Sequence, residues 1–161
     1  MSPKPNTIAA SAIIAVLGLA VISMADLNSL TIVPSAYAQS QTFTAELTGK
    51  DETPPVSTPA TGTAHFQLSS DGKQLNYDLS TTNLKGFMMA HIHQGKAGAS
   101  GQPLVELSMG KGKITSSDLQ GPLAGKQMSD LVNMIKSGGA YVNVHTQQNQ
   151  NGEIRGQIMS G

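Results

Sequence analysis

The sequence predicts an all-β fold, an antiparallel β-sandwich or barrel with one short helix at about residues 128–137. Three observations lead to this prediction. From residue 42 onward, apolar and polar residues alternate over short runs, which is the period of a half-buried strand. Turn-forming Gly, Pro, Asn and Asp residues separate these runs, as in sandwiches and barrels. One segment alone shows the three-to-four-residue apolar spacing of an amphipathic helix.

The first 38 residues are expected to form a signal peptide or an N-terminal membrane anchor. Small and aliphatic residues run over 8–25, and Ala36-Tyr37-Ala38 has the small-x-small pattern of a signal peptidase site, which predicts cleavage before Gln39. The apolar run is also just long enough to span a bilayer and lies unusually far from the cleavage site, so an uncleaved anchor is the alternative. Either outcome places residues 39–161 outside the cytoplasm, secreted or anchored to the outer face of the cell membrane.

Length and composition limit the class of protein to which residues 39–161 can belong. They have the size of one domain, and without any cysteine the exported domain must rely on its hydrophobic core instead of disulfides. Lys+Arg and Asp+Glu balance at ten each and are scattered along the chain, which excludes the basic stripe of a nucleic-acid-binding protein. Aromatic residues make up 4% of the chain, which argues against a stacking platform for bases or sugars.

Three strands are expected in the first half of the domain. The first and second are separated by a proline-containing loop over 50–61, and the second and third by Ser70-Asp71-Gly72-Lys73. The Asp-Gly pair predicts a tight hairpin, because it tolerates the positive φ angles of such a turn. The alternation predicts the inward residues of the three strands as Phe43, Ala45 and Leu47, then Ala64, Phe66 and Leu68, then Leu75, Tyr77 and Leu79.

The next strand, over about 86–93, has two apolar faces. One face carries Met88, Ala90 and Ile92, and the other carries Phe87, Met89, His91 and His93. The first face is expected inside, because two adjacent histidines are costly to bury unpaired. A glycine-rich loop follows, then a short strand over 104–107, and Ile114 with Leu119 marks the edge of another strand.

A helix is expected from Ser129 to Ser137, capped by Ser129 and stopped by Gly138-Gly139. It is too short to be stable alone, so it must pack on the strands. Its apolar stripe consists of Met128, Leu131, Met134 and Ile135. Two final strands flank an Asn-Gly turn, and their predicted inward residues are Val142, Val144 and Thr146, then Ile154, Gly156 and Ile158.

Three motifs together resemble the CHRD domain family: Ala90-His-Ile-His-x-Gly-x-x-Gly-x-x-Gly, Gly139-Ala-Tyr-Val-Asn-Val-His-Thr and Gly152-Glu-Ile-Arg-Gly-Gln-Ile. The resemblance covers about residues 42–159, and departs at Gln150, where family members often carry Pro. It implies an immunoglobulin-like or superoxide-dismutase-like β-sandwich or barrel, partly through a similarity to Cu/Zn superoxide dismutase. It also implies an exported setting and no particular biochemical activity, since the family is named for chordin, an extracellular binder of growth factors.

His91, His93 and His145 are the candidate metal ligands. The first two lie two residues apart on one strand, so they point the same way, about 6.6 Å apart, and can converge on one ion. His145 has the same parity on its own strand, and all three share one face if the two strands are neighbours. Imidazole ligands favour copper or zinc. Met89 is a candidate soft ligand for copper, although surface packing is its more ordinary role.

The favoured interpretation of these histidines is structural. His91 and His93 are expected to hydrogen-bond backbone carbonyls of the glycine-rich loop, and His145 those of the turn over 147–152. On the same face, the polar side chains of Asn143, Glu153 and Arg155 are expected to form a local hydrogen-bonded network, with Glu153 and Arg155 close enough to pair.

The predicted function is a non-enzymatic extracytoplasmic binding or structural module, with an unidentified extracellular protein or matrix partner. The first alternative is copper or zinc binding through the His-x-His motif and the third histidine. The second is a dismutase-like redox enzyme. The resemblance argues against this enzyme, because the dismutase uses six histidines and an aspartate, whereas this chain has four histidines and His65 lies on another strand. No paired carboxylates or activated nucleophile stand out, so no catalytic residue is predicted.

Overall fold

The computed structural model describes residues 40–161, so the predicted signal peptide or anchor over 1–38 lies outside the described residues. The strands are β1 Thr42–Thr48, β2 Thr61–Leu68, β3 Leu75–Thr82, β4 Phe87–Gln94, β5 Pro103–Leu107, β6 Gly110–Ile114, β7 Ala140–Thr146, β8 Ile154–Gln157 and β9 Met159–Ser160. The helices are α1 Met128–Lys136 and the short 3-10 helices η1 Gly49–Asp51, η2 Ser116–Asp118 and η3 Gly121–Leu123. Among the described residues, no helix is long and apolar enough to cross a membrane.

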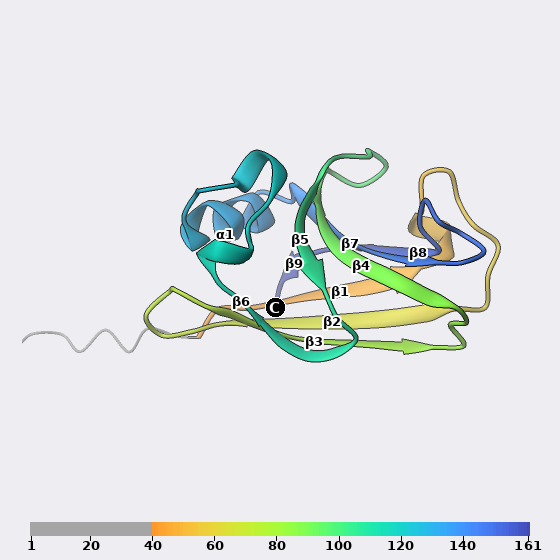
Figure 1. Ribbon diagram of the computed structural model, residues 1–161, viewed down its shortest axis with the longest axis horizontal. Coiled ribbons are helices and arrows are strands. Elements are labelled where there is room, and N and C mark those ends of the chain that lie inside the picture. Colours follow the sequence, from red (N-terminus) through yellow and green to blue (C-terminus); the bar gives the residue numbers. More distant parts are fainter. Residues whose placement is uncertain (1–39) are drawn as a thin grey trace, which may run out of the picture. The chain divides into compact units, whose positions relative to one another are not determined.

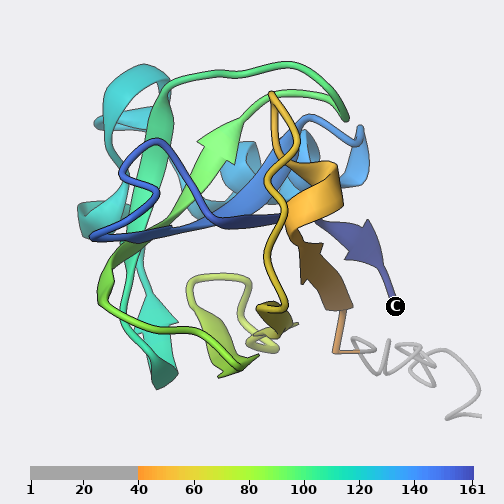
Figure 2. The ribbon, with the colours of Figure 1, turned by 90° about the vertical axis from the view of Figure 1, so that its right-hand side faces the viewer.

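All strands belong to one antiparallel sheet with the order β5-β4-β7-β8-β1-β2-β3-β6, and β9 pairs with β1. The two ends of this order, β5 and β6, are consecutive in the chain and are joined only by Ser108 and Met109. The sheet therefore curls into a nearly closed barrel, with β1–β3 on one side and β4, β5 and β7 on the other (Figures 1 and 2). This confirms the predicted all-β architecture with one short α-helix.

The barrel interior is filled by alternate residues of its strands. The predicted inward sets of β1, β2 and β3 are buried, except that Leu68 at the end of β2 is only partly covered. The inward residues of β7 and β8 continue the same core, because Val142, Val144 and Ile154 are fully buried. Alternation thus predicts these inward residues correctly, although in β7 and β8 residues of the other face are buried as well.

The predicted inward face of β4 needs one correction. Ala90 and Ile92 are fully buried, but Met88 is 44% exposed. The register between β4 and β7 shifts between Phe87 and Met89, which is a β-bulge. A bulge inserts an extra residue and interrupts the alternation, so Met88 leaves the core although it has the parity of Ala90.

The helix α1 lies at one end of the sheet (Figure 1) and buries Met128, Leu131, Val132 and Ile135. Its predicted cap, Ser129, is wrong by two residues. The N-cap is Gln127, whose backbone N–H donates to the Asp130 carboxylate at 2.9 Å. An acidic residue in the first turn also complements the helix dipole, so Asp130 stabilises this end in two ways.

The edge strand β6 was predicted only in part: Ile114, expected to mark the edge of a strand, is its last residue, but the rest of the strand was not placed. In β6 the sequence Gly-Lys-Gly-Lys-Ile lacks apolar alternation, yet it pairs with β3 along its length. Gly112 is required there because a Cβ would overlap the ring of Tyr77. The expected strand edge at Leu119 is wrong, because this buried residue follows η2 and belongs to no strand. The two-residue strand β9 was also missed.

Leu79→Ala tests the packing of the barrel. Leu79 is 1% exposed, so the substitution leaves a cavity and is expected to lower the free energy of unfolding by about 2–5 kcal/mol, measured by urea denaturation. Met159→Ala is the control, because Met159 is 59% exposed and its truncation is expected to change stability by less than about 0.5 kcal/mol. Equal losses in the two variants would contradict this account of the core.

Candidate metal site

The pairing of β4 with β7 determines where the histidines point. The register places Met89 opposite His145, His91 opposite Asn143, and His93 opposite Tyr141. Cross-strand partners in an antiparallel pair project to the same face. The two strands are therefore neighbours, as the histidine hypothesis requires, and all three imidazoles project from one face, opposite the face that carries Ala90, Ile92 and Val144.

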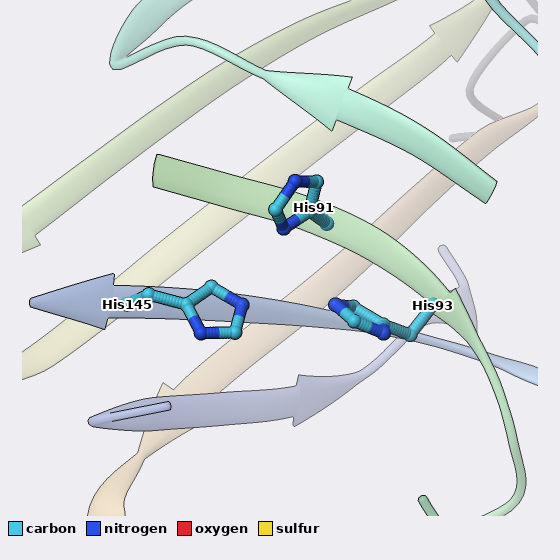
Figure 3. Close-up of side chains that lie close together, drawn as sticks. All are labelled: His91, His93 and His145. Carbon is cyan, nitrogen blue, oxygen red and sulfur yellow. The ribbon is translucent and has the colours of Figure 1, made fainter. Parts of the chain in front are cut away.

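The three rings converge, as Figure 3 shows. Ring centroids are separated by 5.4 Å between His91 and His93, 5.3 Å between His91 and His145, and 5.8 Å between His93 and His145. One ring nitrogen of each histidine lies within 4.8 Å of those of the other two. Nitrogen ligands about 2.05 Å from a shared tetrahedral ion would lie about 3.4 Å apart. Ring movements of about an ångström are therefore enough to bring three ligands onto one ion.

Two of the rings are held by loop carbonyls. The Nδ1–H of His93 donates to the carbonyl oxygen of Gly101 at 3.0 Å, and that of His145 donates to the carbonyl oxygen of Gln150 at 2.8 Å. For these two rings, the predicted anchoring of the glycine-rich loop and of the 147–152 turn is confirmed. Because a carbonyl only accepts, each Nδ1 carries the proton, and the Nε2 of each neutral ring has a free lone pair.

The remaining ring nitrogens are unusual for a protein interior. His91 Nδ1, His93 Nε2 and His145 Nε2 are buried and have no hydrogen-bond partner among the described residues. Most buried polar atoms in folded proteins do have a partner. His93 and His145 have a carbonyl bond on one nitrogen and a free lone pair on the other, the arrangement of metal-bound histidines, because the bond fixes both the tautomer and the ring orientation. The carbonyl bond expected for His91 is not found among the described residues, so that part of the prediction is wrong.

Burial favours the neutral form of all three imidazoles. It is the main cause that lowers the pKa of His91, His93 and His145, and neighbouring imidazoles lower the pKa of His91 and His93 further. The bonds to Gly101 and Gln150 oppose this by raising the pKa of His93 and His145, but the net direction is downward. A metal binds only the neutral imidazole, so the site is prepared for a cation without releasing protons at neutral pH.

Tyr141 and Arg155 support the site from the side of the glycine-rich loop. The ring of His93 stacks on Tyr141, with centroids 5.2 Å apart and planes 13° apart. The Arg155 guanidinium carbon lies 3.4 Å from the Tyr141 ring centroid, and the guanidinium donates to the carbonyl oxygens of Lys96 at 3.0 Å and Ala99 at 2.8 Å. Because these contacts fix both the loop and the ring of His93, this imidazole has little freedom to turn away.

The predicted polar network is present, but its partners differ from the predicted ones. Arg155 donates hydrogen bonds to the loop carbonyls and to Thr53, whereas Glu153 accepts hydrogen bonds from other side chains. The expected pairing of Arg155 with Glu153 is therefore wrong. The donors to Glu153 are Thr58 at 2.7 Å, Thr146 at 2.6 Å and Asn149 at 3.4 Å. Asn143 donates to Glu52 at 2.7 Å, and burial raises the pKa of that carboxyl.

Two members of this surrounding network have no clear signal in the sequence. Glu52 lies in the proline-containing loop, and no pattern in the sequence near it indicates a contact with β7. Tyr141 cannot be told from an ordinary aromatic residue of a strand. His65 is not part of the site. It is exposed on β2, where it pairs with Thr44 and Asp78, and β8 and β1 separate this strand from β7.

One family model covers most of the described residues. The model of the CHRD domain matches residues 43–158. The chain belongs to the CHRD domain family. No curated protein and no solved structure matches it significantly. The match runs from β1 through β8, so the CHRD domain contains the whole histidine cluster and the loops that hold it.

The lowered pKa values give the CHRD domain a defined pH dependence. Below about pH 6.5 the histidines of the unfolded chain take up protons, whereas the folded domain resists protonation. The unfolded state then binds more protons, so the free energy of unfolding of the metal-free protein is expected to fall as pH decreases from 7.5 to 5.5. Urea denaturation at several pH values measures this loss.

The matched control is the triple variant His91→Gln/His93→Gln/His145→Gln. It retains Glu52 and the other titrating groups, so the difference between the two pH profiles isolates the contribution of the histidines. We expect a smaller loss of stability toward low pH in the triple variant. Parallel profiles would show that the three imidazoles do not contribute.

Proposed function

We propose that this CHRD domain is a non-enzymatic extracytoplasmic module that captures one copper or zinc ion through His91, His93 and His145. The observation that carries the proposal is the convergence of three imidazoles whose buried free nitrogens have no partner in the described part of the chain. Imidazole nitrogen suits both copper and zinc. The carbonyl bonds that orient His93 and His145 supply the outer shell that such sites need.

The residues around the histidine cluster suit capture of a metal ion better than redox catalysis. A dismutase-type centre needs a second metal and a bridging histidine, and the fourth histidine, His65, is exposed on a distant strand. The carboxylates nearest in the network, Glu52 and Glu153, accept hydrogen bonds from Asn143, Thr58, Thr146 and Asn149. They are therefore engaged in holding loops, which supports a static binding role.

The proposed setting is outside the cytoplasm. The leader predicted over 1–38 and the chordin-type family both point there, and the domain has no cysteine whose thiolate would compete for copper or zinc. Capture by neutral imidazoles does not depend on the redox state of thiols. An unidentified extracellular protein or matrix partner, which the sequence also predicts, is compatible with a domain that carries a metal.

Equilibrium dialysis against Zn(II) and Cu(II), followed by elemental analysis, tests the proposal. The wild-type protein is expected to retain about one ion per chain, because three imidazoles converge on one point. The His91→Ala/His93→Ala variant removes two of the three ligands and is expected to lose the ion. His65→Ala is the matched control, because it removes a histidine from outside the cluster, and it is expected to bind as the wild type does.

Circular dichroism of each variant separates loss of metal from loss of fold. A double variant that stays folded and loses the ion supports capture. A wild-type protein that retains no ion, together with a double variant that unfolds, would mean that the histidines act only as scaffold and would end the proposal.

A further inference from the structure

We infer that Met89 is a fourth ligand of the histidine cluster and that the site prefers Cu(I) over Zn(II). The inference rests on the proposed metal function and extends it to the identity of the ion. Its starting point is the register, which places Met89 directly opposite His145. Such cross-strand partners have Cβ atoms about 5 Å apart and share a face, so the thioether starts beside the cluster.

The backbone next to Met89 contains a β-bulge, which departs from regular strand geometry. The bulge between Phe87 and Met89 lies where β4 passes the histidine cluster. Bulges re-aim side chains and are frequent beside functional sites. Met89 is 39% exposed, so its side chain is not committed to the core, and its three rotatable bonds let the sulfur reach a neighbouring ion.

Three histidines leave at least one position of a tetrahedral ion unfilled. On this face Asn143 lies opposite His91 and donates its Nδ2–H to Glu52, whereas its Oδ1 has no partner among the described residues, so this amide oxygen is one competitor for the open position. Two further candidates border the cluster in the register: Met89, opposite His145, and the exposed Glu106, opposite His91. A thioether selects the soft Cu(I) ion, whereas a carboxylate favours a harder divalent ion, so the ligand determines the metal.

One buried charge beside the site, that of Arg155, favours a neutral ligand and a monovalent ion. Arg155 is only 2% exposed, and its hydrogen bonds go to neutral oxygens of Thr53, Lys96 and Ala99. Its guanidinium lies over the ring of Tyr141, on which the ring of His93 stacks, so its positive charge lies beside the cluster. A fixed cation repels a divalent ion about twice as strongly as a monovalent one at the same distance. The charge of Arg155 therefore favours a monovalent ion, and the carboxylates of Glu52, which interacts with Arg155, and Glu106, which interacts with His91, oppose this effect.

Met89→Leu tests the inference, because leucine keeps the size and apolarity of the side chain but has no sulfur. Cu(I) affinity is measured without oxygen by competition with bathocuproine disulfonate, and Zn(II) affinity by competition with a chromophoric zinc chelator. Loss of outer-shell partners alone costs 10–100-fold in metal affinity, so loss of a direct ligand is expected to weaken Cu(I) binding at least about ten-fold. Zn(II) affinity is expected to change little.

Two further variants make the test specific. Met159→Leu removes an exposed methionine on β9, which pairs with β1, and is expected to bind Cu(I) like the wild type. Glu106→Gln removes the competing carboxylate and is also expected to leave Cu(I) binding unchanged. The X-ray absorption spectrum of the Cu(I)-loaded wild type is expected to contain a sulfur scatterer that Met89→Leu lacks.

The outcomes distinguish this inference from the proposed function. If the wild type binds metal through the histidines but Met89→Leu binds Cu(I) equally well, or Glu106→Gln causes the loss instead, the Met89 inference is overturned and metal capture stands. If the wild type binds neither Cu(I) nor Zn(II) more tightly than the His91→Ala/His93→Ala variant, both fall.

Discussion

The hydrogen-bonded register between β4 and β7 is the constraint on which the histidine cluster depends. It buries Ala90, Ile92 and Val144 in the barrel and, because side chains alternate along a strand, it turns His91, His93 and His145 to the opposite face. A slip of one residue would turn the imidazoles into the barrel and the aliphatic side chains to the outer face. The burial that stabilises the barrel therefore also places the three rings on one face.

Loop anchoring and metal binding are compatible uses of the same imidazoles. His93 and His145 each give one nitrogen to a loop carbonyl and leave the other free. The structural interpretation that the sequence favoured is therefore correct for these two hydrogen bonds, and the bonds are what present the free nitrogens to a common point. Tyr141 and Arg155 extend this by tying the glycine-rich loop to the face from which the rings project.

What the sequence predicts well is what depends on local alternation. The inward residues of β1 and β3 follow from period two alone, and so does the shared parity of the three histidines. The sequence could not predict that β4 and β7 are neighbours, and the histidine hypothesis could only assume it, because pairing between strands distant in the chain has no local signature. Met88 was wrongly placed in the core, because a bulge depends on the pairing of two strands and is not visible in the sequence of one. Glu52 was missed because its contact with Asn143 spans 91 residues. The expected pairing of Arg155 with Glu153 failed because loop carbonyls and hydroxyls satisfy both groups.

The energetics of the metal-free cluster give a physical reason to expect a ligand. A buried polar atom without a partner costs about 1–3 kcal/mol, and three such atoms lie together on one face of this domain. Without cysteine the domain has no disulfide to offset that cost. An ion that binds only the folded state removes the cost and adds stability by mass action, about 4 kcal/mol at a thousand times its dissociation constant. A bound metal would thus remove the cost of the unpartnered histidine nitrogens and cross-link β4 and β7, the two strands whose register creates the cluster.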